Sequence, residues 1–260
     1  MTASPVDPGT GTGTVTATIV ESVATISFFH PKGNSLPGAL LTRLAEVIGE
    51  VGSASDARVI VLRSEGHGAF CAGASFDELA AIDSEARGQE FFMGFARVIL
   101  AMKRARQFIV TRVHGKVAGG GIGIVAASDF AIAIDTASVK LSELAIGIGP
   151  FVVGPVIERK IGLAAFATLA VDADFFSARW AEQHGLFAKV AETPAELESM
   201  LNTVVKKLGR ANPEAIAQMK RIFWDGTEQW DTLLRERAAM SGRLVLSDFT
   251  RQAIATFKAT

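Results

Sequence analysis

Short apolar runs that resemble strands alternate with helical patterns over the first 150 residues of this chain. The strand-like runs lie at 15–20, 23–29, 59–62, 109–113, 130–134 and 139–143. Between them, 37–51 places leucines and valines on one helical face, and further helical patterns cover 76–82 and 84–105. Strands that alternate with helices are typical of an α/β protein whose strands pair largely in parallel.

Helical patterns dominate the last third of the chain. They cover about 151–162, 163–170, 177–184, 194–209, 212–223, 227–241 and 246–257, with a short strand at 189–191. The sequence therefore predicts a polar, flexible lead at 1–14, an α/β core at 15–192 and a helical C-terminal region at 193–260.

Composition narrows the classes of function. The chain has 260 residues, is 49% hydrophobic and 20% charged, and carries a net charge of −1. It can bury a large core, and it has no basic excess that would indicate a nucleic-acid surface. Cys71 is the only cysteine and the four histidines are scattered, so we expect no disulfide within the chain and no bound metal. The first 14 residues lack an apolar leader and no apolar run would span a bilayer, so we expect a cytoplasmic protein without a membrane segment.

A glycine-rich segment, Val117-Ala-Gly-Gly-Gly-Ile-Gly123, separates the predicted strand at 109–113 from a helical pattern that starts at 124. Glycine lets a ligand approach the backbone closely. N–H groups at a helix start have no partner within the helix, so they could stabilise a carbonyl oxygen that becomes negative. A plain strand-to-helix turn would explain the same glycines.

Three other segments accompany this run. They are Ala69-Phe-Cys-Ala-Gly-Ala74, Ser128-Asp-Phe-Ala-Ile-Ala133 and Leu141-Ser-Glu-Leu-Ala-Ile-Gly-Ile-Gly-Pro150. In this order and spacing the chain resembles the crotonase superfamily, the enoyl-CoA hydratase/isomerase family, from about residue 15 to 260. Asn34 and its neighbours resemble the family's N-terminal R-P-x-x-x-N-A-L segment. The resemblance implies a crotonase-like core, a spiral of repeated β-β-α units, followed by a helical region.

The resemblance also implies a site for an acyl-CoA thioester. The backbone N–H groups of Ala72 and Gly120 would bind the thioester oxygen as it becomes an enolate. The residues expected to line the substrate are Gly73, Ala74, Gly119, Gly123 and Phe151. Coenzyme A would enter as part of the substrate, with no separate cofactor. The resemblance further implies a homotrimer or homohexamer built through the C-terminal helices, although a helical cap within one chain would explain the same pattern. Lys32, Arg63 and Lys258 could meet the coenzyme A phosphates.

Only one of the family's two acid/base glutamates is present. Hydratases of this family place two glutamates around one water, and here the second is Glu143 while Gly123 occupies the position of the first. One carboxylate can remove a proton and return it elsewhere, so the pattern favours a double-bond isomerase over a hydratase. Apolar neighbours of Glu143 predict partial burial and a raised pKa. Asp77, Glu78 and Glu158 remain candidates for a replacement carboxylate.

Other departures from the family pattern surround the predicted site. Ser75 and Ser142 stand where the family usually has Asp and Pro, and bulky apolar residues at 151–157 replace a Gly-rich turn. We expect these residues either to shape an apolar acyl pocket or simply to pack. Cys71 is interpreted as a small buried residue, since no histidine is placed to activate it.

Two other functions are compatible with the sequence. One is dehydration or decarboxylation of a carboxylated acyl thioester carried on coenzyme A or on a carrier protein, for which one proton donor suffices. The other is a crotonase-fold binding protein that has lost catalysis along with the first glutamate.

Overall fold

The computed structural model describes residues 13–259 of the chain, except for the side chains of 257–259. It begins with a hairpin of β1 (Thr14–Val20) and β2 (Val23–Phe29), which pair antiparallel. Glu21 and Ser22 form its turn with φ of 50° and 66°, the left-handed geometry that two-residue hairpins require. Thr14 thus belongs to a strand, not to the predicted lead, and residues 1–12 of that lead lie outside the described part.

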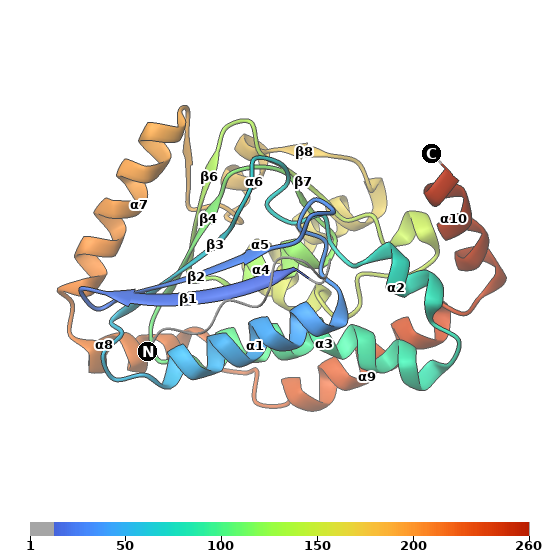
Figure 1. The fold of residues 1–260 in the computed structure, drawn as a ribbon, viewed down its shortest axis with the longest axis horizontal. Helices are drawn as coiled ribbons and strands as arrows, with labels where there is room; N and C mark the ends of the chain where they lie inside the picture. Colours follow the sequence, from blue (N-terminus) through green and yellow to red (C-terminus); the bar gives the residue numbers. More distant parts are fainter. Residues whose placement is uncertain (1–12, 260) are drawn as a thin grey trace.

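A six-stranded sheet forms the centre of the molecule, in the order β1-β2-β3-β4-β6-β9 (Figure 1). Its other strands are β3 (Val59–Ser64), β4 (Ile109–Val113), β6 (Phe130–Ile134) and β9 (Lys189–Ala191). All neighbouring pairs from β2 onward are parallel. The first four residues of β3 are all buried, as expected for a parallel strand that is covered on both faces.

A smaller sheet lies next to the first and contains β5 (Val117–Ala118), β7 (Ser138–Lys140) and β8 (Phe176–Ser177). Successive strands alternate between the two sheets: β4 is followed by β5 and then by α4 (Gly120–Ala127), and β6 is followed by β7. This alternation forms the predicted β-β-α spiral. Strand β7 ends at Lys140 and does not continue to 143 as predicted, because the chain turns there toward the 3-10 helix η1 (Leu144–Ile146).

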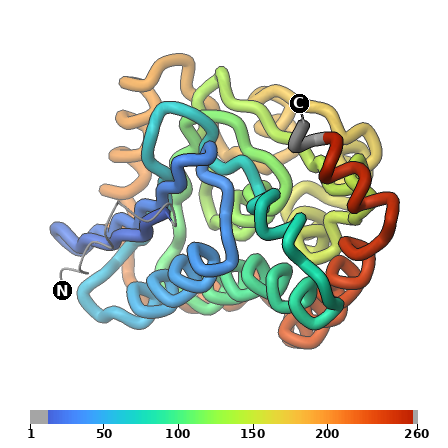
Figure 2. Tube along the Cα trace, turned by 45° about the vertical axis from the view of Figure 1, so that its right-hand side comes forward, coloured from blue at the N-terminus to red at the C-terminus, as the bar shows by residue number. Residues whose placement is uncertain are grey.

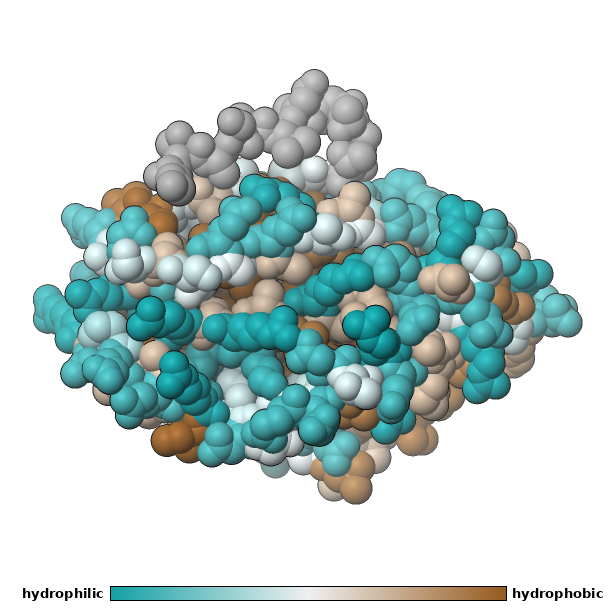
Figure 3. All heavy atoms as spheres, turned by 90° about the horizontal axis from the view of Figure 1, so that it is seen from below, coloured by the Kyte–Doolittle hydropathy of each residue, from teal (hydrophilic) through white to brown (hydrophobic). Residues whose placement is uncertain are grey.

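Three long helices lie together along one side of the larger sheet (Figure 1). They are α1 (Gly38–Ser53), α3 (Glu85–Arg104) and α9 (Trp230–Leu244). Helix α1 buries Leu40, Leu44, Val47 and Val51 on one face, which is the predicted pattern. The side of the molecule that Figure 3 shows from below is largely hydrophilic, in keeping with helices that turn their polar faces outward.

The remaining helices are α2 (Phe76–Ala81), α5 (Gly154–Asp172), α6 (Ala178–Gln183), α7 (Pro194–Gly209), α8 (Pro213–Phe223) and α10 (Asp248–Ala259). The predicted start of a helix at 151 is wrong, because residues 151–153 form a turn and Pro155 occupies the first turn of α5. Gly162 interrupts α5 with a φ of 78°, where the sequence predicted a boundary between two helices. No helix within residues 13–259 is long and apolar enough to cross a membrane.

One buried hydrophobic cluster includes both the α/β core and the C-terminal helices. It joins Val110 and Ile132 of the sheet to Leu197, Leu234 and Ile254 of the last four helices. Helix α10 returns to the core and lies beside α2, where it also contacts η1 (Figure 2). The C-terminal helices are therefore packed on the core, and α10 lies next to the turn that carries Glu143.

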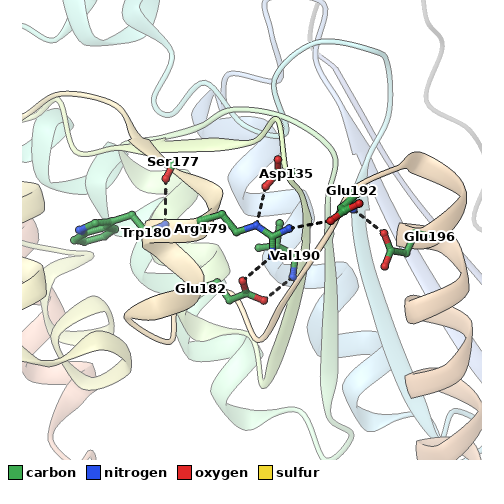
Figure 4. A network of polar contacts seen from close by, with 8 residues as sticks. All are labelled: Asp135, Ser177, Arg179, Trp180, Glu182, Val190, Glu192 and Glu196. Carbon is green, nitrogen blue, oxygen red and sulfur yellow. Dashed lines mark hydrogen bonds and ion pairs between the residues drawn. The ribbon is translucent and has the colours of Figure 1, made fainter.

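A polar network fastens α6 to the edge of the larger sheet (Figure 4). The Arg179 side chain donates to Asp135 at 2.9 Å and to Glu182 at 3.1 Å. Glu182 in turn accepts the N–H of Val190 in β9 at 3.0 Å. The network is exposed and none of its residues lines the pocket described below, so we interpret it as structural.

Candidate active site

The smaller sheet brings the two predicted oxyanion segments side by side. Cys71 pairs with Val117 in an isolated bridge, and the N–H of Ala118 donates to the Cys71 carbonyl at 2.8 Å. A Cβ added to Gly73, whose φ is 91°, would lie 3.1 Å from the Ala118 carbonyl oxygen. The tight packing explains why small residues follow Phe70 in the sequence.

Gly120 is the first residue of helix α4, so its N–H has no acceptor within the helix. A Cβ on Gly120 would lie 2.1 Å from the Phe95 ring of α3, so glycine is required for this helix start to pack against that ring. Gly119 precedes it with a φ of 50°. The local geometry of Gly120 is therefore that of an available backbone donor.

The other predicted donor, Ala72, has a different environment. Its N–H donates to the Gly33 carbonyl at 3.1 Å, so this hydrogen is used within the chain. A substrate oxygen at Ala72 would have to share the N–H with Gly33 or displace the loop that holds Gly33. Sequence reasoning did not foresee this bond, because it joins segments almost 40 residues apart.

Glu143 lies directly before η1, and its carboxylate faces the glycine run. Its Oε1 atom would be 3.3 Å from a Cβ placed on Gly119. The residue is half-buried, but its Oε2 atom is fully buried and has no hydrogen-bond partner within the described part of the chain. Burial raises the pKa of Glu143 to about 7, although backbone N–H groups of Glu143 and Ser142 partly offset the effect. A carboxylate of this kind can accept and release a proton near neutral pH.

A small pocket of about 50 Å³ opens beside this carboxylate. It is lined by Ala72, Gly73, Ala74, Phe76, Leu79, Phe92, Phe95, Gly119, Gly120, Ser142, Glu143, Ile146, Ile148, Gly149, Pro150, Phe151, Val152, Val153 and Ser241. Seven of the eight predicted site residues are among them, and the exception is Gly123. The segment 150–153 also lines the pocket, where the sequence predicted an apolar acyl end.

Gly123 is covered by Val153. A Cβ on Gly123 would lie 2.5 Å from Cγ1 and 2.8 Å from Cβ of Val153, far inside van der Waals contact. The side chain of Val153 thus fills the space that a glutamate at 123 would need. The pocket lacks the first glutamate and has hydrocarbon near that position.

The three candidate replacement carboxylates do not line the pocket. Asp77 pairs with Lys32, and Glu78 accepts the N–H of Gly38 at 2.7 Å. Glu158 is exposed on α5. Within the described residues, Glu143 is the one carboxylate of the pocket wall.

Two of the three basic residues suggested for the coenzyme A phosphates lie next to carboxylates of the chain. The Lys32 ammonium is paired with Asp77, and the Arg63 guanidinium lies 3.5 Å from Glu65. Lys258 belongs to the residues whose side chains are not described. Cys71 is fully buried, which confirms its interpretation as a small buried residue, and burial raises the pKa of its thiol to about 12.

Sequence reasoning missed pocket residues that come from distant helices. Phe92 and Phe95 extend from α3, and Ser241 from α9. Helices α3 and α9 touch at Gly88 and Gly242, where a Cβ on Gly88 would lie 2.7 Å from the Gly242 Cα. Glycines at these two positions were the available signal, but nothing in the sequence pairs them.

The fold and the site define a class: an α/β spiral with a buried carboxylate beside a glycine-rich helix start. A family model described as enoyl-CoA hydratase/isomerase matches residues 18–255. The chain therefore belongs to the enoyl-CoA hydratase/isomerase family, as the sequence motifs predicted.

Individual relatives show how far the similarity extends. The chain is 29% identical over 204 residues to the bacillaene synthase dehydratase PksH of Bacillus subtilis, covering 78% of this chain and 77% of the relative. It is 26% identical to a short-chain-enoyl-CoA hydratase of Clostridium acetobutylicum, covering 90% of each. A crystal structure of a putative enoyl-CoA hydratase from Mycobacterium avium paratuberculosis matches with a TM-score of 0.85 and 27% identity, covering 94% of this chain and 96% of that one.

Proposed function

We propose that this protein binds an acyl-CoA thioester and shifts the double bond of its acyl group, with Glu143 as the single acid/base. The observation that carries the proposal is the lone carboxylate of the pocket, whose buried Oε2 has no partner in the described chain. The other glutamate position is Gly123, and Val153 fills the space over it. Membership of the enoyl-CoA hydratase/isomerase family supports the acyl-CoA substrate.

The proton transfers follow from the positions of these groups. The thioester oxygen would lie at the Gly120 N–H, with Ala72 as second donor once its bond to Gly33 is shared. Glu143 takes a proton from the α carbon, and the electron pair moves into an enolate that the N–H donors stabilise. The protonated Glu143 then returns the proton to the γ carbon, so that a 3-enoyl thioester becomes a 2-enoyl thioester and Glu143 is regenerated.

Hydration requires a second group that holds and activates water, and the described pocket wall lacks it. Water must be held and activated above the double bond, and in this family a second carboxylate does so. Here the position of that carboxylate is Gly123, and Val153 places methyl groups against it. Apolar groups neither polarise water nor hold it in place.

Replacing Glu143 by Gln tests the acid/base assignment. The amide keeps the shape of the carboxylate but cannot exchange the proton, so isomerisation of a 3-enoyl-CoA should fall by about 10²–10⁴-fold. Calorimetric binding of a saturated acyl-CoA should change little. In the unsubstituted enzyme, kcat/KM should rise with pH up to about 7 and then level off, because the ionised carboxylate is the base. Activity that survives Glu143→Gln would overturn the proposal.

A pair of substitutions tests the reason for the lost hydration. Gly123→Glu alone should lower the melting temperature and give no hydration, since its Cβ collides with Val153. Gly123→Glu combined with Val153→Gly makes the space, and we expect measurable hydration of a 2-enoyl-CoA. Val153→Gly alone is the control. A folded double variant without hydration would show that more than the second carboxylate is lacking.

A second candidate is dehydration or decarboxylation of a carboxylated acyl thioester on coenzyme A or a carrier protein. The similarity to the bacillaene synthase dehydratase favours it. In decarboxylation, the carbon–carbon bond to the carboxylate breaks, carbon dioxide leaves and Glu143 supplies the proton. The two candidates differ in the charge of the acyl group.

We also infer that the chain assembles as a homotrimer or homohexamer. Large apolar side chains on α5 (Leu163 and Val171) and on α8 (Ile222 and Phe223) are 50–73% exposed. Arg159 of α5 donates to the Phe223 carbonyl at 2.6 Å, which holds the two helices together. Exposed apolar surface of this kind supports contact with another copy of the chain.

A further inference from the structure

Within residues 13–256, whose side chains are described, the pocket wall contains one ionisable side chain, that of Glu143. Of the nineteen lining residues, the only other polar side chains are the hydroxyls of Ser142 and Ser241. None of these lining residues is a lysine, arginine or histidine. The described wall therefore offers no positive side chain to an anionic group of a substrate.

Two lysines belong to segments of the site, but their ammonium groups have other partners. The Lys140 carbonyl accepts the Gly119 N–H at 2.9 Å, while its Nζ lies 3.8 Å from Asp174 and 5.4 Å from the centre of the Phe175 ring. Lys32, one residue before Gly33, is paired with Asp77. Neither lysine lines the pocket.

A carboxylate placed in this pocket would be unfavourable for two reasons. It would lose its hydration without gaining a cation, because the Gly120 and Ala72 N–H groups are assigned to the thioester oxygen, and removing an ion from water costs several kcal/mol unless it is paired. It would also lie near the carboxylate of Glu143, and two like charges at short range disfavour each other. An acyl group of carbon and hydrogen has neither cost and gains from contact with Phe92, Phe95 and Phe151.

From this wall, and resting on the function proposed above, we infer that the pocket selects thioesters with an uncharged acyl group and excludes those whose acyl group ends in a carboxylate. The space beside Glu143 is small, about 50 Å³. Phe151 closes one side, where a Cβ on Gly149 would lie 2.4 Å from its ring.

Two coenzyme A esters of nearly equal size test the selection. Malonyl-CoA and 3-methylbutanoyl-CoA have the same number of heavy atoms in the acyl group, and a carboxylate replaces an isopropyl group of the same branched shape. We expect calorimetry at pH 8 to show at least tenfold tighter binding of 3-methylbutanoyl-CoA. In Glu143→Gln the preference should shrink but persist, because the amide removes the repulsion and not the cost of desolvation.

The outcomes separate this inference from the function on which it rests. Equal or tighter binding of malonyl-CoA overturns the charge selection and leaves the acyl-CoA site standing. If neither ester binds, the proposed function itself fails. A preference that disappears entirely in Glu143→Gln would assign the selection to that one residue and overturn the role of the wall.

A substitution in the wall gives an independent check. Phe151→Arg places a guanidinium at the pocket and should reverse the preference toward malonyl-CoA, while Phe151→Met, of similar length and no charge, should keep it. Thermal unfolding establishes that both variants fold. A folded Phe151→Arg with the original preference would show that the acyl end lies elsewhere.

Discussion

The Asn34 side chain positions part of the site through hydrogen bonds to backbone groups. It is buried, with a left-handed φ of 56°, which asparagine tolerates better than most residues. Its Oδ1 accepts from the His30 N–H at 2.8 Å, and its Nδ2 donates to the carbonyls of Glu65 and Ala69, each at 2.9 Å. The side chain thus ties the loop that contains Gly33 to the segment that leads to Ala72.

Replacing Asn34 by Asp should therefore disturb both stability and catalysis. The shape is kept, but a carboxylate oxygen would face the two carbonyl oxygens to which the amide NH2 group now donates. We therefore expect a loss of about 2–3 kcal/mol in the free energy of unfolding, measured in urea. Catalysis should fall in kcat more than in KM, since the donor at Ala72 moves. Asn34→Gly, which keeps the backbone angle, should be milder. An Asp variant with unchanged kcat would refute the positioning role.

At the residue scale, sequence motifs predicted Glu143, Gly120 and five others of the nineteen residues that line the pocket. The residues of a short motif are adjacent in the sequence, so a candidate acid/base glutamate or a glycine-rich helix start can be recognised without knowledge of the fold. The contact between Gly123 and Val153 could not be predicted, because it joins α4 to the start of α5 across the fold. The engagement of the Ala72 N–H by Gly33 was hidden for the same reason.

Among the elements, α8 is attached to the sheet by a buried ion pair. Lys220 of α8 is 2% exposed, and its Nζ donates to Asp129 and to the Gln107 carbonyl, both at 2.8 Å. Asp129 also accepts the Ile109 N–H, at 2.7 Å, where β4 begins. This pair joins the C-terminal helices to the centre of the sheet.

Removing one member of the pair leaves a buried charge without a partner. Lys220→Met should cost about 3–5 kcal/mol in the free energy of unfolding, measured by denaturant titration. Adding Asp129→Asn to Lys220→Met should recover part of that loss, since the remaining charge is removed. If the single variant is as stable as the original chain, the pair does not hold α8 to the sheet.

The alternation of strands and helices predicted an α/β core with parallel strands, and the family resemblance predicted the spiral, while several element boundaries differed. Periodicity shows where a face is buried, but not where a short apolar run changes from strand to turn. Leu141 continues the alternating apolar pattern of β7, yet residues 141–143 turn toward η1 and so place Glu143 beside the glycine run. The boundary that the pattern misplaced is thus part of the site.

For the whole molecule, the exposed apolar side chains of α5 and α8 support the proposed assembly into a homotrimer or homohexamer. Light scattering after size exclusion should give a mass that is three or six times that of one chain. Ile222→Arg, at a side chain that is 64% exposed, should shift the protein toward smaller species without lowering its stability. Val20→Arg, at a 66% exposed valine of β1, is the matched control. A monomer in the unsubstituted protein would refute the assembly.

The fit of Val153 over Gly123 also bears on how such a chain can change over generations. A glutamate that arises first at 123 meets a filled space, and a glycine that arises first at 153 leaves a void in a packed wall. Each single step is expected to yield a less stable protein than either end point. We therefore expect that single substitutions, one at a time, do not lead to a two-glutamate arrangement unless stability gained elsewhere compensates for the less stable intermediate.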